Sequence, residues 1–351
     1  CMFKVITEEN EWNRAISSFG KKDFYHSYDY HQVCIKDNEV AKLLLYKSGN
    51  TSIAFPLVIR PINGSGFFDA TSVYGYAGPL ISGLTSHFDF QDWKEQMLGY
   101  FLDDKIISIF SSTNPFIDNQ EQLLSHMGEI ESLGDIVYFD LKQSKAHLKQ
   151  YSKTTKRYIK RNKELFDIRE GNSEDDARQF LEIYYQSMER VGANSQYYFK
   201  LPYFIKLLRN HSFFDASFVF ATSKENGDVA SGAFIIRTKD HIVQYHLSGT
   251  VDAYRHLSPI RGVIDYVRCQ GKLDSYNFFN LGGGVGSKND SLYDFKASFS
   301  KKTAPFKVWK YISNIEVYDQ LCTIAREKEG EENSNTNYFP AYRTNSYFGT
   351  P

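Results

Sequence analysis

The chain has 351 residues, of which 42% are hydrophobic and 24% charged, and its formal net charge is −1 at pH 7. This balance excludes a protein drawn as a whole to nucleic acid or membrane, so any anion site must be local. No run approaches the roughly 18 apolar residues of a membrane helix, and the four cysteines have no paired or metal-binding spacing. We therefore expect a cytoplasmic protein with reduced thiols, no metal site and, at this length, two domains.

The first half of the chain predicts helices that alternate with strands. Two of the strands are separated by the turn-forming residues SGNT, which indicates a hairpin. The expected helices are 10–19, 28–36, 87–103 and 119–127, and the expected strands are 41–47, 52–62, one within 66–75, 105–112 and 135–141.

The second half repeats this order without obvious sequence identity. An Asn-Gly turn in ENGD, which favours a two-residue hairpin, separates its first two strands. The expected helices are 173–191, 259–271 and 290–299, and the expected strands are 217–224, 229–238, 241–249, 276–281 and 304–312.

The repeated order predicts a mixed-sheet α/β fold in two tandem domains, and each half resembles the order of elements in an N-acetyltransferase (GNAT) domain. We expect an N-terminal domain over 1–141, a long basic linker helix over 142–165, a C-terminal domain over 166–326 and a tail over 327–351. The polar run 326–337 is expected to be mobile, and the aromatic NYFPAYR at 337–343 to dock back on the protein.

Four stretches together resemble signature segments of the FemAB-like branch of the GNAT superfamily, over nearly the whole chain. They are YGYAGPL at 74–80, TTKRYIKR at 154–161, QSMERVGANSQYYF at 186–199 and NLGGGVGSKNDSLYDFKASFS at 280–300. The resemblance implies an acyl- or aminoacyltransferase acting on an amine of a cell-envelope or polysaccharide precursor, such as one for peptidoglycan. The acceptor would be a nucleotide- or lipid-linked sugar or peptide. The donor would be aminoacyl-tRNA or acyl-coenzyme A, with no bound cofactor.

The resemblance also places the pair Phe295 and Lys296 at the reaction centre. Acyl transfer develops negative charge on a carbonyl oxygen, which a fixed ammonium stabilises. The structural alternative for Lys296 is a solvated helix lysine. His246 is a candidate general base for the attacking amine, and its alternative is a hydrogen-bonded strand histidine.

The GGGVG stretch at 282–286 is not followed by the Lys-Ser or Lys-Thr of a nucleotide P-loop. It also comes one element too late for the loop that cradles the coenzyme A pyrophosphate in GNAT enzymes, and the loop at that place, 249–262, is poor in glycine. We interpret the stretch as a catalytic floor; the alternative is a turn capped by Asn289 or Asp290. Candidate substrate-binding residues are Tyr74, Tyr76, Arg190, Tyr254, Gly283, Gly284 and Tyr293, with Arg190 matched by resemblance to a position that grips acceptor phosphates.

The basic segment carries no acidic residue between Lys142 and Lys163. Helical spacing puts several of its cations on one face, where they would bind phosphates or RNA or simply be solvated. The candidates are Lys153, Lys156, Arg157 and Lys160. No heptad run predicts the coiled-coil arm found in some aminoacyltransferases. A non-catalytic module that binds a nucleotide sugar or glycan stays open as a different class of function.

Overall fold

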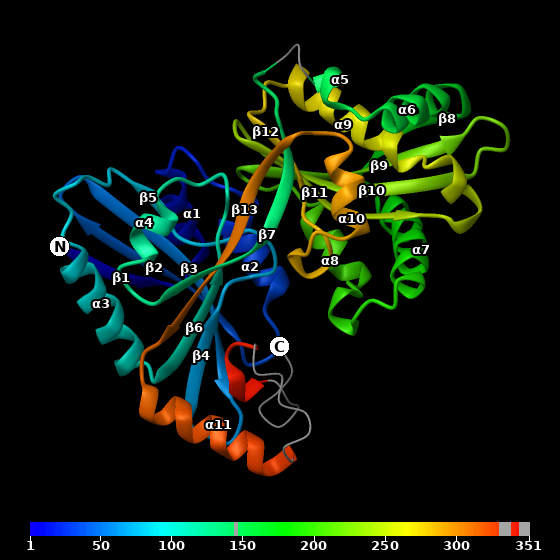
Figure 1. Ribbon diagram of the computed structural model, residues 1–351. Helices are drawn as coiled ribbons and strands as arrows, with labels where there is room; N and C mark the ends of the chain where they lie inside the picture. The colour runs from blue at the N-terminus through cyan, green and yellow to red at the C-terminus, as the bar shows by residue number, and fades with distance from the viewer. Residues whose placement is uncertain (144–146, 330–337, 344–351) are drawn as a thin grey trace. The chain divides into compact units, whose positions relative to one another are not determined.

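The computed structural model describes residues 1–143, 147–329 and 338–343. Its contacts divide the chain into two compact units (Figure 1). Unit 1 combines residues 1–133 with the chain from Phe306 onward, and unit 2 spans Gly134–Pro305. The contacts thus group the chain differently from the four ranges expected from the sequence, because the C-terminal part returns to unit 1.

Unit 1 contains a mixed sheet with the strand order β1-β2-β3-β4-β6-β13, and β5 pairs with β3. Its first four strands are antiparallel, β4 and β6 are parallel, and β6 and β13 are antiparallel. The core packs Trp93 and Phe101 of one helix against Phe55 and Trp309 of the sheet. The strands are β1 Met2–Ile6, β2 Val40–Ser48, β3 Thr51–Ile62, β4 Phe67–Thr71, β5 Leu80–Ser82, β6 Ile106–Ser112 and β13 Lys302–Ile312; the helices are α1 Glu9–Ser17, α2 Tyr28–Cys34, α3 Phe90–Asp103, α4 Gln120–Leu124 and α11 Ile315–Glu329.

Unit 2 repeats this arrangement with the strand order β7-β12-β11-β10-β9-β8. Its strands β8 to β11 are antiparallel, β11 and β12 are parallel, and β12 and β7 are antiparallel. The strands are β7 Glu129–Asp140, β8 Phe166–Gly171, β9 Phe214–Ser223, β10 Val229–Thr238, β11 Ile242–Thr250 and β12 Phe278–Gly282; the helices are α5 His147–Gln150, α6 Lys153–Leu165, α7 Glu174–Arg190, α8 Leu201–Leu207, α9 Ile260–Leu273 and α10 Ser291–Ala297.

The two faces of the unit 2 sheet have different cores. Alternate residues of β10 separate to opposite faces, as strand geometry requires. Ile235 belongs to the cluster that contains α9 residues such as Val263. Phe234 instead packs against Phe180 of α7 and Phe204 of α8, with ring centroids 6.3 and 5.2 Å away.

The last strand of each repeat is exchanged. β7 follows α4 of the first repeat but pairs with β12, and β13 follows α10 of the second repeat but pairs with β6. The sequence predicts strands at 135–141 and 304–312 but not their partners, because local hydrophobicity does not encode pairing.

The expected continuous helix over 142–165 is wrong, because it is interrupted at Tyr151 and Ser152. Tyr151 is buried, and the Ser152 N–H donates to the carbonyl of Ser298 at 2.8 Å. The Ser152 side chain caps α6 by accepting from the Thr155 N–H at 3.0 Å. Both α5 and α6 lie in unit 2, so the basic segment is part of a compact unit and not a separate linker.

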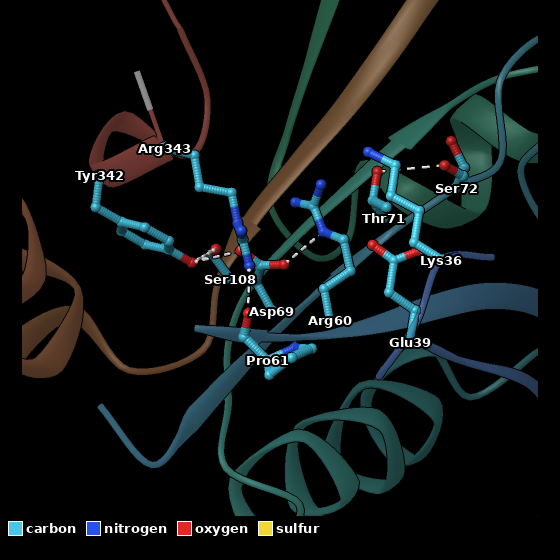
Figure 2. A network of polar contacts seen from close by, with 10 residues as sticks. All are labelled: Lys36, Glu39, Arg60, Pro61, Asp69, Thr71, Ser72, Ser108, Tyr342 and Arg343. Carbon is cyan, nitrogen blue, oxygen red and sulfur yellow. Dashed lines mark hydrogen bonds and ion pairs between the residues drawn. The ribbon is translucent and has the colours of Figure 1, made fainter. Parts of the chain in front are cut away.

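The docking expected of the C-terminal aromatic segment is confirmed for its described residues (Figure 2). Asp69 is 1% exposed and accepts from Arg60 Nε at 2.8 Å, from the Tyr342 hydroxyl at 3.1 Å and from Arg343 Nε. Tyr342 is fully buried and shares a 2.7 Å hydrogen bond with Ser108. Of the run expected to be mobile, 326–329 belong to α11, and 330–337 lie outside the described residues.

Candidate active site

The two parallel strands of unit 2, β11 and β12, pair with each other only over their first residues. β11 and β12 pair only over Ile242–Gln244 and Phe278–Asn280, after which β11 continues to Thr250. At the last pair, Asn280 Nδ2 donates to Gln244 Oε1 at 2.9 Å, and both side chains are 1% exposed. The Asn280 side-chain oxygen also accepts from the Gly282 N–H at 2.8 Å. This buried amide pair fixes the start of the glycine turn, and nothing in the one-dimensional pattern singled it out.

Lys296 is buried beside that turn. It projects from α10, whose N-terminus is capped by Asp290 through the Tyr293 N–H at 2.9 Å. Its ammonium donates to the carbonyl of Gly283 at 2.7 Å, and the residue is 8% exposed. Burial lowers the pKa of Lys296 to about 8, against the opposing charge of Asp290. The alternative of a solvated helix lysine is therefore wrong, whereas the catalytic role stays a prediction.

Phe295 and Tyr293 are half-buried against the core of unit 2. The guanidinium of Arg261 lies 4.6 Å from the centroid of the Phe295 ring, and Phe299 lies 5.4 Å away on its edge. Arg261 also donates to the Ser298 hydroxyl at 2.8 Å. These contacts fix α10 on α9, so the Phe of the Phe-Lys pair orients the helix that carries Lys296.

The glycines were expected to let substrate approach the backbone. At Gly284 the close neighbours are instead parts of the same turn, since an added Cβ would lie 2.0 Å from the Lys288 carbonyl oxygen and 2.2 Å from Asp290 Oδ1. Gly283 supplies the carbonyl that holds Lys296. Both glycines are half-buried, and their binding role stays a prediction.

His246 and its neighbour Tyr245 occupy opposite faces of β11. Tyr245 packs against the cluster that contains α9, whereas His246 Nε2 lies 2.6 Å from the Tyr203 hydroxyl and its ring lies 6.1 Å from that of Phe234. Burial lowers the pKa of His246 to about 3, so the imidazole is neutral near pH 7. Its role as general base stays a prediction. His246 contacts Tyr203 and Phe234, whereas Lys296 contacts the Gly283 carbonyl.

Arg190 and Tyr254 connect neighbouring elements of unit 2. Arg190, at the end of α7, forms an ion pair with Asp252 and donates to the Thr250 carbonyl at 3.3 Å. The Tyr254 hydroxyl donates to Asp228 at 3.4 Å and accepts from Asn226 at 3.0 Å. A phosphate bound by Arg190 would therefore compete with a carboxylate already in place.

Tyr74 and Tyr76 lie in unit 1, whereas the other predicted site residues lie in unit 2. Tyr74 is 47% exposed, and its carbonyl accepts from the Tyr30 hydroxyl at 3.0 Å. Tyr76 is half-buried, with ring centroids 5.9 Å from Tyr25 and 5.2 Å from Phe306. Tyr74 is thus largely exposed, and Tyr76 is part of an aromatic cluster.

The basic helix α6 is amphipathic. Thr155, Ile159 and Asn162 are buried against unit 2, which leaves the cations on the outer face. The exposed candidates are Lys153, Lys156, Arg157 and Lys160. The predicted basic face is therefore present on a helix that is firmly packed.

Two helices are placed where the coenzyme A site of GNAT enzymes would be: α9, which follows β11 in unit 2, and α3, which follows β4 and β5 in unit 1. In both helices, N–H groups of the first turn already donate to a side chain. At α9, Asn162 Oδ1 accepts from the Gly262 N–H at 3.1 Å while its Nδ2 donates to the Leu257 carbonyl at 2.9 Å. At α3, the Asp89 carboxylate accepts from the N–H groups of Gln91 and Asp92 at 3.1 and 3.0 Å. These are the positions where GNAT enzymes hold the pyrophosphate of coenzyme A. An anion would have to displace an amide in one unit and a carboxylate in the other.

Two surface cavities lie away from these residues. One, of about 620 Å³ in unit 1, is lined by Tyr311, Tyr318 and Tyr338 among others. The other, of about 370 Å³ in unit 2, surrounds Arg237. Neither is lined by a predicted site residue, and in the described ranges no cluster of histidine, cysteine and acidic side chains has the makings of a metal site. Among the same residues no helix is both long and apolar enough to span a membrane.

Comparison with known proteins shows the fold. No family model matches the chain, and no curated protein matches its sequence. The match to the structure of FemX covers 91% of this chain and 99% of the FemX chain at 11% identity, with a TM-score of 0.67. The match to L-PGS from Bacillus licheniformis covers 88% of this chain and 93% of the L-PGS chain at 15% identity, with a TM-score of 0.57. The C-terminal domain of a putative lysylphosphatidylglycerol synthetase from Agrobacterium fabrum covers 89% and 96% at 14% identity, with a TM-score of 0.53. The chain thus has the two-unit mixed α/β fold of FemX, which confirms the FemAB-like GNAT architecture expected from its sequence.

Proposed function

We propose that this protein is an aminoacyltransferase that moves an amino acid from aminoacyl-tRNA to an amine of a cell-envelope precursor. The observation that carries the proposal is the buried ammonium of Lys296, held at 2.7 Å by the Gly283 carbonyl where two parallel strands part. Burying an ammonium destabilises the folded protein, and titratable groups perturbed in this way cluster at functional sites; stabilising the oxyanion of acyl transfer would be such a function. The fold supports it too, because the C-terminal domain of a putative lysylphosphatidylglycerol synthetase shares it, and that name describes an aminoacylated lipid as product.

In the proposed reaction the acceptor amine attacks the ester carbonyl carbon of the aminoacyl-tRNA. A C–N bond forms, and the carbonyl oxygen becomes an oxyanion that the Lys296 ammonium stabilises. The tetrahedral intermediate then breaks its C–O bond to the ribose, and the ribose oxygen takes up the proton that the amine releases. With its pKa lowered to about 8, Lys296 is still mostly protonated at pH 7, as this role requires.

The occupied helix termini favour tRNA over coenzyme A as the donor. A coenzyme A donor needs unoccupied N–H groups for its pyrophosphate, whereas Asn162 already accepts from the Gly262 N–H in α9 and the Asp89 carboxylate adds a repelling charge in α3. The exposed cations of α6 offer the complementary feature, a surface for RNA phosphates. The acceptor is proposed to be a nucleotide- or lipid-linked peptide or sugar precursor.

The test is a transfer assay with tRNA charged with a labelled amino acid and a UDP-linked muropeptide as acceptor. We expect label in the muropeptide, a loss of about 100-fold or more in kcat for Lys296→Met, and no change for a control at the exposed Lys301. Transfer from acyl-coenzyme A instead would establish the alternative donor. Acceptor binding without transfer from any donor would indicate the non-catalytic binding module.

The RNA surface is tested separately by neutralising three lysines of α6. Replacing all three by Gln should raise the KM for charged tRNA about tenfold or more and flatten its salt dependence, with kcat preserved. The three are Lys153, Lys156 and Lys160; the matched control neutralises the exposed Lys47, Lys200 and Lys301. Equal effects of the two triple variants would contradict a specific role for α6.

A further inference from the structure

The turn between β12 and α10 is closed by one side chain. Asp290 Oδ2 accepts from the Val285 N–H at 3.0 Å, and Oδ1 accepts from the Tyr293 N–H at 2.9 Å. The first bond spans the turn, and the second caps the helix that carries Lys296. A single carboxylate therefore ties the backbone on one side of the site to the helix on the other.

The backbone of the turn is packed directly on this carboxylate. At Gly284 even one methyl group would lie 2.2 Å from Asp290 Oδ1 and 2.0 Å from the Lys288 carbonyl oxygen. The φ of Gly284 is −79°, a value open to any residue, so glycine is needed here for space. The adjoining Gly283 carbonyl, the acceptor of the Lys296 ammonium, is thereby held in place.

From this geometry we infer that Asp290 is the positioning residue of Lys296: it clamps the turn that presents the Gly283 carbonyl and places a negative charge in the turn that holds the ammonium. The inference rests on the proposed function for its catalytic meaning but not for its electrostatic one. The negative charge of Asp290 opposes the lowering of the Lys296 pKa by burial.

Asp290 itself is held in its charged form. Burial alone would raise its pKa, but hydrogen bonds from the backbone of Tyr293, Val285 and Leu292 lower it. The carboxylate therefore stays ionised wherever Lys296 titrates. The N–H groups of Val285 and Tyr293, which Asp290 holds in place, thus also keep its carboxylate negatively charged.

The experiment compares Asp290→Asn with Asp294→Asn, an exposed acid on the same helix. Asn keeps a side-chain oxygen for capping but removes the charge. Two readouts are followed: the alkaline limb of the transfer rate and the pKa of Lys296 from the carbon chemical shifts of labelled lysine. In Asp290→Asn both should move to lower pH by about half a unit or more, and in Asp294→Asn neither should move.

The outcomes separate the two proposals. A shift of both readouts supports the inference. A shift of the NMR pKa in a protein without transfer activity supports the electrostatic role of Asp290 and removes the proposed function. An unchanged NMR pKa in a folded Asp290→Asn variant overturns the inference, because a purely structural cap would lower stability without moving the titration of Lys296.

Discussion

Lys296→Met should make the protein more stable and less active. The burial of this ammonium lowers its pKa from 10.5 to about 8, which corresponds to about 3 kcal/mol of destabilisation at pH 7. Methionine has a similar length and carries no charge. The loss of the hydrogen bond to the Gly283 carbonyl offsets about 1 kcal/mol, so the variant should gain about 2 kcal/mol.

The pH dependence gives this prediction its sign. Below pH 8 the native ammonium is charged and the full cost is present. Between about pH 8 and 10.5 the native lysine loses its proton while the unfolded one keeps it, so the wild-type protein gains stability relative to the variant. The advantage of Lys296→Met should therefore be largest at pH 7 and vanish near pH 10.

The assay must report on unit 2. The three tryptophans, Trp12, Trp93 and Trp309, all lie in unit 1, so tryptophan fluorescence does not follow the unfolding of unit 2. Hydrogen exchange of the β12 and α10 amides in urea does. A variant that is less stable than wild type at pH 7, or one that keeps full transfer activity, would refute the reasoning; Lys301→Met provides the control.

Three further predictions concern other parts of the chain. His31 lies beside Trp12, and its burial lowers its pKa to about 4. Because the unfolded chain takes up the proton first, the free energy of unfolding should fall by about 3 kcal/mol between pH 6.5 and 4. Tryptophan fluorescence in urea should show a smaller fall for His31→Gln, and an equal fall would contradict the assignment. Arg343→Met removes the hydrogen bonds to Asp69 and to the Pro61 carbonyl but leaves Asp69 paired with Arg60, so it should cost about 2 to 3 kcal/mol in unit 1. Asp69→Asn, which takes the carboxylate from both guanidinium groups, should cost about 3 to 5 kcal/mol; full tryptophan-detected stability of Arg343→Met would argue against the docked tail. Gly284→Ala should open the turn and lower transfer activity at least tenfold. Gly286→Ala has open space around it and a φ of 58°, so it should lower the free energy of unfolding by only about 1 kcal/mol and leave activity largely intact. If Gly286→Ala lost more activity than Gly284→Ala, the clamp would be contradicted.

The sequence by itself determined most of the helices and strands of this protein and their order. Hydrophobic periodicity and turn residues gave the hairpin β9–β10 around its Asn-Gly turn, the amphipathic α7 and the buried β6, because these signals are local. The resemblance of 280–300 singled out Lys296, and the aromatic composition of 337–343 predicted that this segment docks. Short elements such as α8 and the edge strands β1 and β8 escaped, because their periodicity is brief.

Only the tertiary structure decided which segments meet. The exchange of β7 and β13 depends on pairing between distant segments, which local hydrophobicity does not encode. The burial of Lys296, the amide pair of Gln244 and Asn280 and the cap that Asn162 places on α9 join residues far apart in the chain. A buried polar group acquires its meaning from its partners, and those partners exist only once the chain has folded.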